Sequence, residues 1–112
     1  MSARNADISL TFAGADQCIA VVRLARPAKR NALSDGLIAA LRDIFQTLPD
    51  TVRAAVIDGE GEHFCAGLDL SELKERDAGQ GVHHSRHWHS ALDAVQFGPV
   101  PVIAALHGAV VG

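Results

Sequence analysis

The segment VRAAVIDG, at positions 52–59, constrains the fold more than any other part of the sequence. It is a continuous apolar run of strand length, and such a run is typical of a strand that is buried on both faces of a parallel sheet. VIAAL (102–106) is a second run of this kind. Apolar residues recur at helical spacing over 35–48 and 82–97, so strands alternate with helices. This order predicts an α/β fold with crossover connections.

The first half of the chain carries clear signals for its elements. ISLTF (8–12) and CIAVVRL (18–24) predict two strands joined by a turn. Ser34 is placed to cap the helix over 35–48, and Pro49 ends that helix.

The second half is expected to hold a short helix over 68–76, a flexible break over 77–81 and the long helix over 82–97. The spacing of apolar residues predicts that one side of the long helix faces inward. That side consists of Val82, Trp88, Ala91, Leu92 and Val95.

Composition excludes several protein classes. The 112 residues carry a net charge of -3, so the chain lacks the basic face that nucleic acid binding requires. No run approaches the roughly 18 apolar residues of a membrane span, and the N-terminus has no apolar signal region. Cys18 and Cys65 have no metal-binding spacing and are expected to be reduced thiols in a cytoplasm. Because the sequence stops at Gly112, directly after an apolar run, we expect a longer protein.

Two glycine-containing turns follow apolar strands, HFCAGLDL (63–70) and HGAVVG (107–112). Such turns expose backbone N–H groups, and glycine lets the backbone approach a ligand closely. Two turns on neighbouring strands can aim two N–H groups at one oxygen, as in an oxyanion hole. The same pattern also fits ordinary tight turns between strands and helices, and spacing alone leaves both interpretations open.

Three motifs occur in a fixed order, RPAKRNAL (26–33), HFCAGLDL (63–70) and PVIAALHGAVVG (101–112). Together they closely resemble the crotonase superfamily of enoyl-CoA hydratases and isomerases. The resemblance implies the N-terminal part of a crotonase-like ββα spiral fold. Residues 1–112 would then be one segment of a single domain that stops within the glycine-rich second oxyanion-hole motif.

The resemblance also implies roles for individual residues. The backbone N–H of Leu68 would be the first oxyanion donor, and Gly112 would begin the glycine run that supplies the second. The expected coenzyme A contacts are Ala28, Lys29, Arg30, Ala32, Ala66, Asp69 and Leu70. For Asp69, a carboxylate that stabilises a helix start is an equally good interpretation.

The expected activity is hydration of a 2-enoyl-CoA thioester, the commonest chemistry in this superfamily. Isomerase, hydrolase, decarboxylase and lyase reactions stay open, as does a non-catalytic CoA-binding module. The usual acid/base residues would lie beyond Gly112, so the segment alone is expected to be inactive. Coenzyme A would enter as part of the acyl-CoA substrate, with no separate cofactor, and a homotrimer or hexamer is expected.

Four of the six histidines cluster in VHHSRHWHSAL. His83 and His87 have the i,i+4 spacing of metal ligands, but no third ligand lies nearby in sequence, and we expect no metal site. His87 or His89 would face the acyl group if this region packs as in crotonases; otherwise the helix is simply part-exposed. His63 and His107 are expected to bond turn backbone, and Cys65 to be a small apolar filler.

Overall fold

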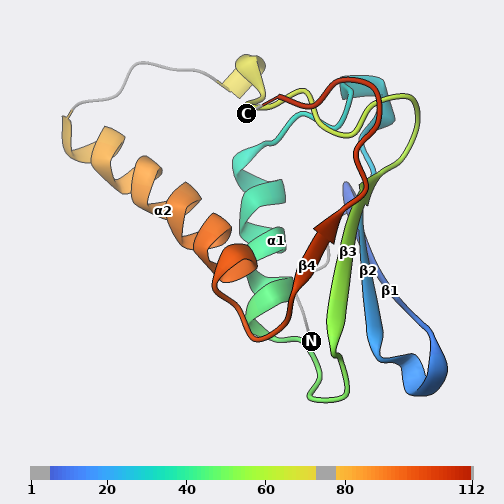
Figure 1. The fold of residues 1–112 in the computed structure, drawn as a ribbon. Coiled ribbons are helices and arrows are strands. Elements are labelled where there is room, and N and C mark those ends of the chain that lie inside the picture. Colours follow the sequence, from blue (N-terminus) through green and yellow to red (C-terminus); the bar gives the residue numbers. More distant parts are fainter. Residues whose placement is uncertain (1–5, 73–77, 112) are drawn as a thin grey trace.

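The computed structural model describes residues 6–72 and 78–111, and their centre is a four-stranded sheet in the order β1–β2–β3–β4 (Figure 1). The strands are β1 (Ile8–Ala13), β2 (Ile19–Leu24), β3 (Ala54–Gly59) and β4 (Val102–Ala104). β1 and β2 are antiparallel, whereas β2, β3 and β4 run parallel. The predicted α/β fold is confirmed, and all four predicted strands are present.

Two helices connect the parallel strands. α1 (Asp35–Gln46) leads from β2 to β3, and α2 (Ala78–Gln96) leads to β4. Three short 3-10 turns complete the described chain, η1 (Ala15–Gln17), η2 (Pro27–Lys29) and η3 (Leu70–Glu72). Within the described residues, no helix combines the length and the apolar character that crossing a membrane requires.

α1 covers one face of the sheet and forms the core with it (Figure 1). The Ser34 hydroxyl accepts a hydrogen bond from the Leu37 N–H at 3.1 Å, which confirms the predicted helix cap. Apolar residues then recur toward the sheet at helical spacing. The buried side chains of α1 are Leu37, Ile38, Ala40, Leu41, Ile44 and Phe45. All of these except Ile38 form one core cluster with Ala20, Val22, Ala55 and Ile57 of the sheet.

The opposite face of the sheet is covered less completely. Val21, Val56 and Ile103 pair in one row across β2, β3 and β4. Val21 and Val56 are half-buried, and Ile103 is 63% exposed. The prediction that the run 52–59 is buried on both faces is therefore wrong for this chain, because no described element covers the face opposite α1.

α2 differs from its prediction in extent and in orientation. It begins at Ala78, so most of the expected break at 77–81 is helical, and residue 77 lies outside the described residues. Val82 and Leu92 are 52% and 47% exposed, whereas Ala91 is fully buried. The predicted inward side is thus wrong for two residues. α2 packs along α1 rather than over the sheet, so only a narrow stripe of it is covered (Figure 1).

The helix predicted over 68–76 is shorter in the structure. A 3-10 turn spans Leu70–Glu72, and it is preceded by Leu68, which forms an isolated β-bridge with Leu33, and by Asp69. Residues 73–76 lie outside the described residues.

Candidate functional site

Three loops meet at one edge of the sheet, where the parallel strands end. They are residues 25–33 after β2, 60–70 after β3 and 105–111 after β4 (Figure 1). Parallel strands direct their carboxyl ends to the same edge, and this is where open α/β sheets bind ligands. The prediction that the two glycine turns lie next to each other is confirmed by the bonds described below.

Backbone hydrogen bonds join the first loop to the second. The Leu33 N–H donates to the Gly67 carbonyl at 2.7 Å, and the Asp69 N–H donates to the Leu33 carbonyl at 2.9 Å. The Ala66 N–H donates to the Arg30 carbonyl at 2.9 Å. The two loops therefore pair like short parallel strands, with a bridge between Leu33 and Leu68.

A second set of backbone bonds joins residues 63–70 to residues 107–111. The Cys65 N–H donates to the Ala109 carbonyl at 3.1 Å, and the Val111 N–H donates to the Cys65 carbonyl at 3.0 Å. The Phe64 N–H donates to the His107 carbonyl at 2.8 Å. The middle loop is thus held on both sides by main-chain contacts.

Leu68 lies between two hydrogen-bonded residues of this loop, and its own N–H is not bonded to a described residue. Its neighbours Gly67 and Asp69 are both bonded to Leu33, but the Leu68 N–H has no acceptor among the residues that the structure describes. Gly67 has a φ of 88°, and a Cβ there would lie 3.3 Å from Val111, so glycine suits this position. A donor N–H fixed between two bonded peptides has the preorganisation that an oxyanion hole requires. Gly112, the predicted start of the second donor segment, lies outside the described residues.

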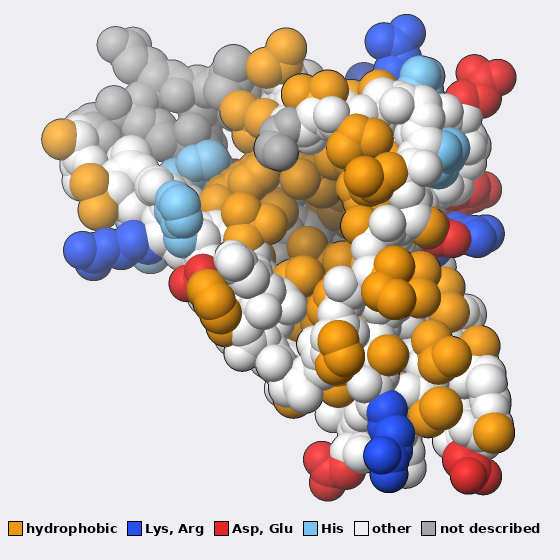
Figure 2. Space-filling model, viewed as in Figure 1, with side chains coloured by type: hydrophobic (Ala, Val, Ile, Leu, Met, Phe, Trp, Pro, Cys, Tyr) orange, Lys and Arg blue, Asp and Glu red, His pale blue; other side chains and the backbone are white. Residues whose placement is uncertain are grey.

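The predicted coenzyme A residues lie on these same loops. Ala28 and Lys29 are in η2 and Arg30 follows it, all three with exposed side chains. Ala32 and Ala66 are half-buried. Leu70 is 72% exposed. Figure 2 shows a hollow beside α2 where hydrophobic side chains gather.

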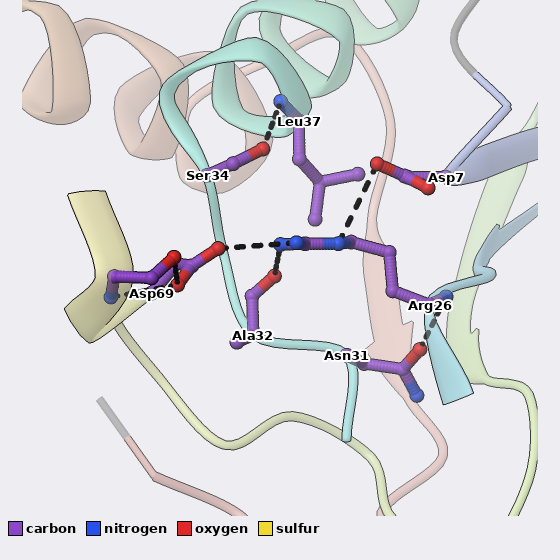
Figure 3. A network of polar contacts seen from close by, with 8 residues as sticks. Asp7, Arg26, Asn31, Ala32, Ser34, Leu37 and Asp69 are labelled. Atoms are coloured by element: carbon purple, nitrogen blue, oxygen red, sulfur yellow. Dashed lines mark hydrogen bonds and ion pairs between the residues drawn. The ribbon is translucent and has the colours of Figure 1, made fainter. Parts of the chain in front are cut away.

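Arg26 and Asp69 form the centre of a polar network beneath the loops (Figure 3). Arg26 Nη1 donates to the Ala32 carbonyl at 2.6 Å, and Nη2 donates to Asp69 Oδ2 at 3.0 Å. Arg26 Nε lies 3.5 Å from an Asp7 carboxylate oxygen. Asp69 Oδ1 accepts from the Ser71 hydroxyl at 2.7 Å and from the Ser71 N–H at 3.0 Å. Asp69 therefore stabilises the start of η3, which confirms the second interpretation of this residue.

Sequence reasoning missed Asn31, which is fully buried between the loops. Its Oδ1 accepts from the Arg26 N–H at 2.8 Å, and its Nδ2 donates to the carbonyls of Glu60 and His63 at 3.0 and 2.7 Å. Its φ is 57°, a left-handed conformation that Asn tolerates better than most residues. The available signal in the sequence is an asparagine in the proline-containing loop 25–33, three residues before the Ser34 cap.

Comparison with known proteins decides the family. The enoyl-CoA hydratase/isomerase family model matches residues 14–112, which is most of the chain. This chain belongs to the enoyl-CoA hydratase/isomerase family. A crystal structure from Rhodopseudomonas palustris, named provisionally as an enoyl-CoA hydratase, is 51% identical with a TM-score of 0.91, and the match covers 100% of this chain and 42% of that one.

Two further relatives support this membership. A Mycobacterium bovis protein named provisionally as an enoyl-CoA hydratase is 35% identical over 99 residues, which are 86% of this chain and 38% of the relative. A Thermobifida fusca structure that holds CoA is 28% identical with a TM-score of 0.79, covering 92% of this chain and 42% of that one. A second Thermobifida fusca structure holds acetoacetyl-CoA. This family member thus spans about two fifths of the length of the relatives it matches.

Two histidines of this family member stabilise the turns, as predicted. His63 Nδ1 accepts from the Ala109 N–H at 2.9 Å, and His107 Nε2 lies 2.9 Å from the Gly61 carbonyl oxygen, to which it donates. Both rings therefore hold the loops 60–70 and 105–111 together.

Two of the histidines of α2, His84 and His87, face α1. His84 Nε2 lies 2.8 Å from Asp35 Oδ1, the same oxygen to which Trp88 Nε1 donates at 3.1 Å. His87 Nδ1 lies 3.4 Å from Arg42 Nη1. The exposed His89 lines an open groove beside the end of α1. Contact of His87 or His89 with an acyl group stays a prediction, and the described residues contain no group of three metal-binding side chains.

The two cysteines are expected to differ in reactivity toward iodoacetamide. Burial raises the pKa of the Cys65 thiol, and its Sγ accepts from the Gly67 N–H at 3.3 Å. Cys18 is half-buried and serves as the internal control. Peptide mapping should show alkylation of Cys65 at least about tenfold slower than that of Cys18 in the folded chain. Equal rates would show that the loop around Cys65 opens readily.

The carboxylate of Asp69 is expected to make stability depend on pH. Its hydrogen bonds from Ser71, and then from Arg26, hold its pKa below the ordinary value. A carboxyl with a lower pKa in the folded state stabilises the fold above its unfolded pKa of about 4 and loses this effect as the pH falls further. Urea titrations should therefore show a smaller loss of stability below about pH 4 in Asp69→Asn. An unchanged pH profile would contradict the network.

Proposed function

We propose that this chain forms the coenzyme A site and one oxyanion donor of an acyl-CoA-processing enzyme, and that the reaction is hydration of a 2-enoyl-CoA. The observation that carries the proposal is the Leu68 N–H, which is held between two peptides bonded to Leu33 and has no acceptor within the described residues. The CoA held by one Thermobifida fusca structure supports a coenzyme A ligand, and the acetoacetyl-CoA held by another supports a thioester.

The chemistry explains the need for such a donor. When water adds to the β carbon of the enoyl group, electron density moves through the double bond onto the thioester oxygen. The water loses one proton to a base, and the α carbon takes up a proton. The Leu68 N–H stabilises the negative oxygen, together with a second donor expected from the glycine run at Gly112. Removing one such donor typically raises the barrier by about 2.7–4 kcal/mol.

The remaining site residues are assigned by chemistry. Lys29 and Arg30 are exposed cations at the mouth of the site, suited to charge-assisted hydrogen bonds with coenzyme A phosphates. Ala28, Ala32 and Ala66 are small residues that let the adenine approach the backbone. Exposed apolar side chains of the loops offer contact to an acyl chain. They are Leu68, Leu70, Leu106, Val110 and Val111.

Ligand binding is tested by the melting temperature of the purified chain with and without CoA. A ligand that binds the native state stabilises it, by about 2.7 kcal/mol at a hundredfold excess over Kd. We expect CoA to raise the melting temperature, and we expect the double variant Lys29→Gln with Arg30→Gln to reduce the shift. Arg53→Gln is the matched control, because Arg53 is an exposed cation at the opposite end of β3. Absence of any shift with CoA would overturn the proposal.

The role of Leu68 is tested with an acyl-CoA labelled with 13C at the thioester carbonyl. Leu68→Pro removes the N–H, whereas Leu68→Ala keeps it and serves as the control. The carbonyl resonance should move on binding to Leu68→Ala and should move less with Leu68→Pro. Equal movement would exclude this N–H as a donor.

Turnover by a protein that continues past Gly112, where the acid/base residues are expected, separates the remaining alternatives. With crotonyl-CoA, a hydratase gives a product that has gained one water, whereas an isomerase given a 3-enoyl-CoA leaves the mass unchanged. CoA binding without turnover of any thioester would favour the non-catalytic binding module. Light scattering on the same samples tests the expected trimer or hexamer.

A further inference from the structure

Arg26 is a side chain that contacts two of the three loops of the candidate site. It follows β2, and its side chain is 14% exposed. The guanidinium donates to the Ala32 carbonyl in the loop 25–33 and to Asp69 in the loop 60–70, and it pairs with Asp7 just before β1 (Figure 3). A planar guanidinium fits such a multiple contact, whereas an ammonium group offers a single point of charge.

The two main partners of Arg26 are the immediate neighbours of the bridged residues Leu33 and Leu68. Ala32 directly precedes Leu33, and Asp69 directly follows Leu68. Arg26 therefore spans the same junction as the backbone bridge between Leu33 and Leu68. The Asp69 peptide that donates to Leu33 is anchored by its own side chain to Arg26.

We infer that Arg26 is a positioning residue: through Asp69 and Ala32 it fixes the Leu68 N–H relative to the loop 25–33. The consequence for acyl-CoA rests on the proposed function, because that loop is where coenzyme A would bind. Arg26 itself contacts no reacting atom in this scheme. It links occupancy of the coenzyme A loop to the geometry of the oxyanion donor.

Arg23 provides a matched control for the loss of an arginine–aspartate pair. Its Nε and Nη2 donate to the two carboxylate oxygens of Asp58 at 3.0 and 2.8 Å. This pair joins β2 to β3 on the exposed side of the sheet and involves none of the three loops of the site. Arg23→Ala therefore removes similar chemistry without the proposed positioning.

Amide hydrogen exchange by NMR tests the inference on the purified chain without ligand. In Arg26→Ala, exchange of the Leu33 and Asp69 amides should accelerate about tenfold or more relative to the core amide of Val22, as expected when charged hydrogen bonds are lost locally. Arg23→Ala should leave this ratio unchanged. Arg26→Lys keeps a charge for Asp69 and should give an intermediate ratio, and it carries the test if Arg26→Ala does not fold.

The inference would be overturned if the exchange rates of Leu33 and Asp69 relative to Val22 were the same in Arg26→Ala as in the unmodified chain. This includes the case in which exchange at Val22 accelerates equally, because Arg26 would then stabilise only the fold. The labelled acyl-CoA gives a second readout, in which Arg26→Lys should bind with a smaller movement of the carbonyl resonance. If the unmodified chain binds no acyl-CoA, the proposed function fails while the exchange ratio still decides the role of Arg26. If acyl-CoA binds and the ratio is unchanged, the positioning role fails and the proposed function stands.

Discussion

Replacing Phe45 by alanine is expected to lower the free energy of unfolding by about 3–5 kcal/mol, the usual range for a buried phenylalanine. Phe45 is 1% exposed and is the largest of the fully buried side chains. It lies in α1 where that helix meets the sheet, so its removal leaves a cavity that neighbouring side chains fill only in part. Urea unfolding followed by circular dichroism measures the change.

Phe97 supplies the control for this substitution. It is 74% exposed, just after α2, so Phe97→Ala deletes the same atoms from the surface. Its effect should stay within about 0.5 kcal/mol. Similar losses from both variants would contradict the packing of α1 against the sheet.

Replacing Asn31 by alanine is expected to have an effect of similar size. The change leaves the Arg26 N–H and the carbonyls of Glu60 and His63 without their partner, at about 1–3 kcal/mol for each buried group left unpaired. Alanine also adopts the left-handed backbone at this position less readily than asparagine, which adds about 1 kcal/mol. We expect a total loss of at least about 3 kcal/mol in urea unfolding.

Two further variants separate the contributions of Asn31. Asn31→Gly relieves the backbone strain but restores no hydrogen bond, so it should recover only the smaller part of the loss. Asn31→Asp keeps an acceptor for the Arg26 N–H but loses both donors and places a charge against two carbonyl oxygens. A loss below about 1 kcal/mol in Asn31→Ala would show that water replaces these bonds.

The elements that follow from local chemistry could be predicted from the sequence. The Ser34 cap and the parallel strands at 52–59 and 102–106 have signals within a few residues. The inward side of α2 could not be predicted, because it depends on what α1 presents. α1 offers Asp35 and Arg42, so polar residues of α2 turn inward and Val82 and Leu92 stay exposed.

In the candidate site, too, local features could be predicted from the sequence, whereas contacts between distant residues could not. The motifs point to Leu68 and the loops around it, and the structure brings those loops together through backbone bonds. The motifs do not reveal that Arg26 contacts Asp69, because the two residues are 43 positions apart and spacing carries no signal over that distance. The role of Asn31 likewise appears only when the carbonyls of Glu60 and His63 lie beside it.

The Leu68 side chain makes none of the bonds that hold its peptide, and this has a consequence for mutational tolerance. Any residue except proline supplies the same N–H, and the side chain at position 68 is 38% exposed, so little packing restricts its size. A saturation library at position 68 should therefore retain function with most substitutions. Position 68 would then tolerate most substitutions although its N–H takes part in the proposed chemistry, and proline would be the substitution that abolishes function.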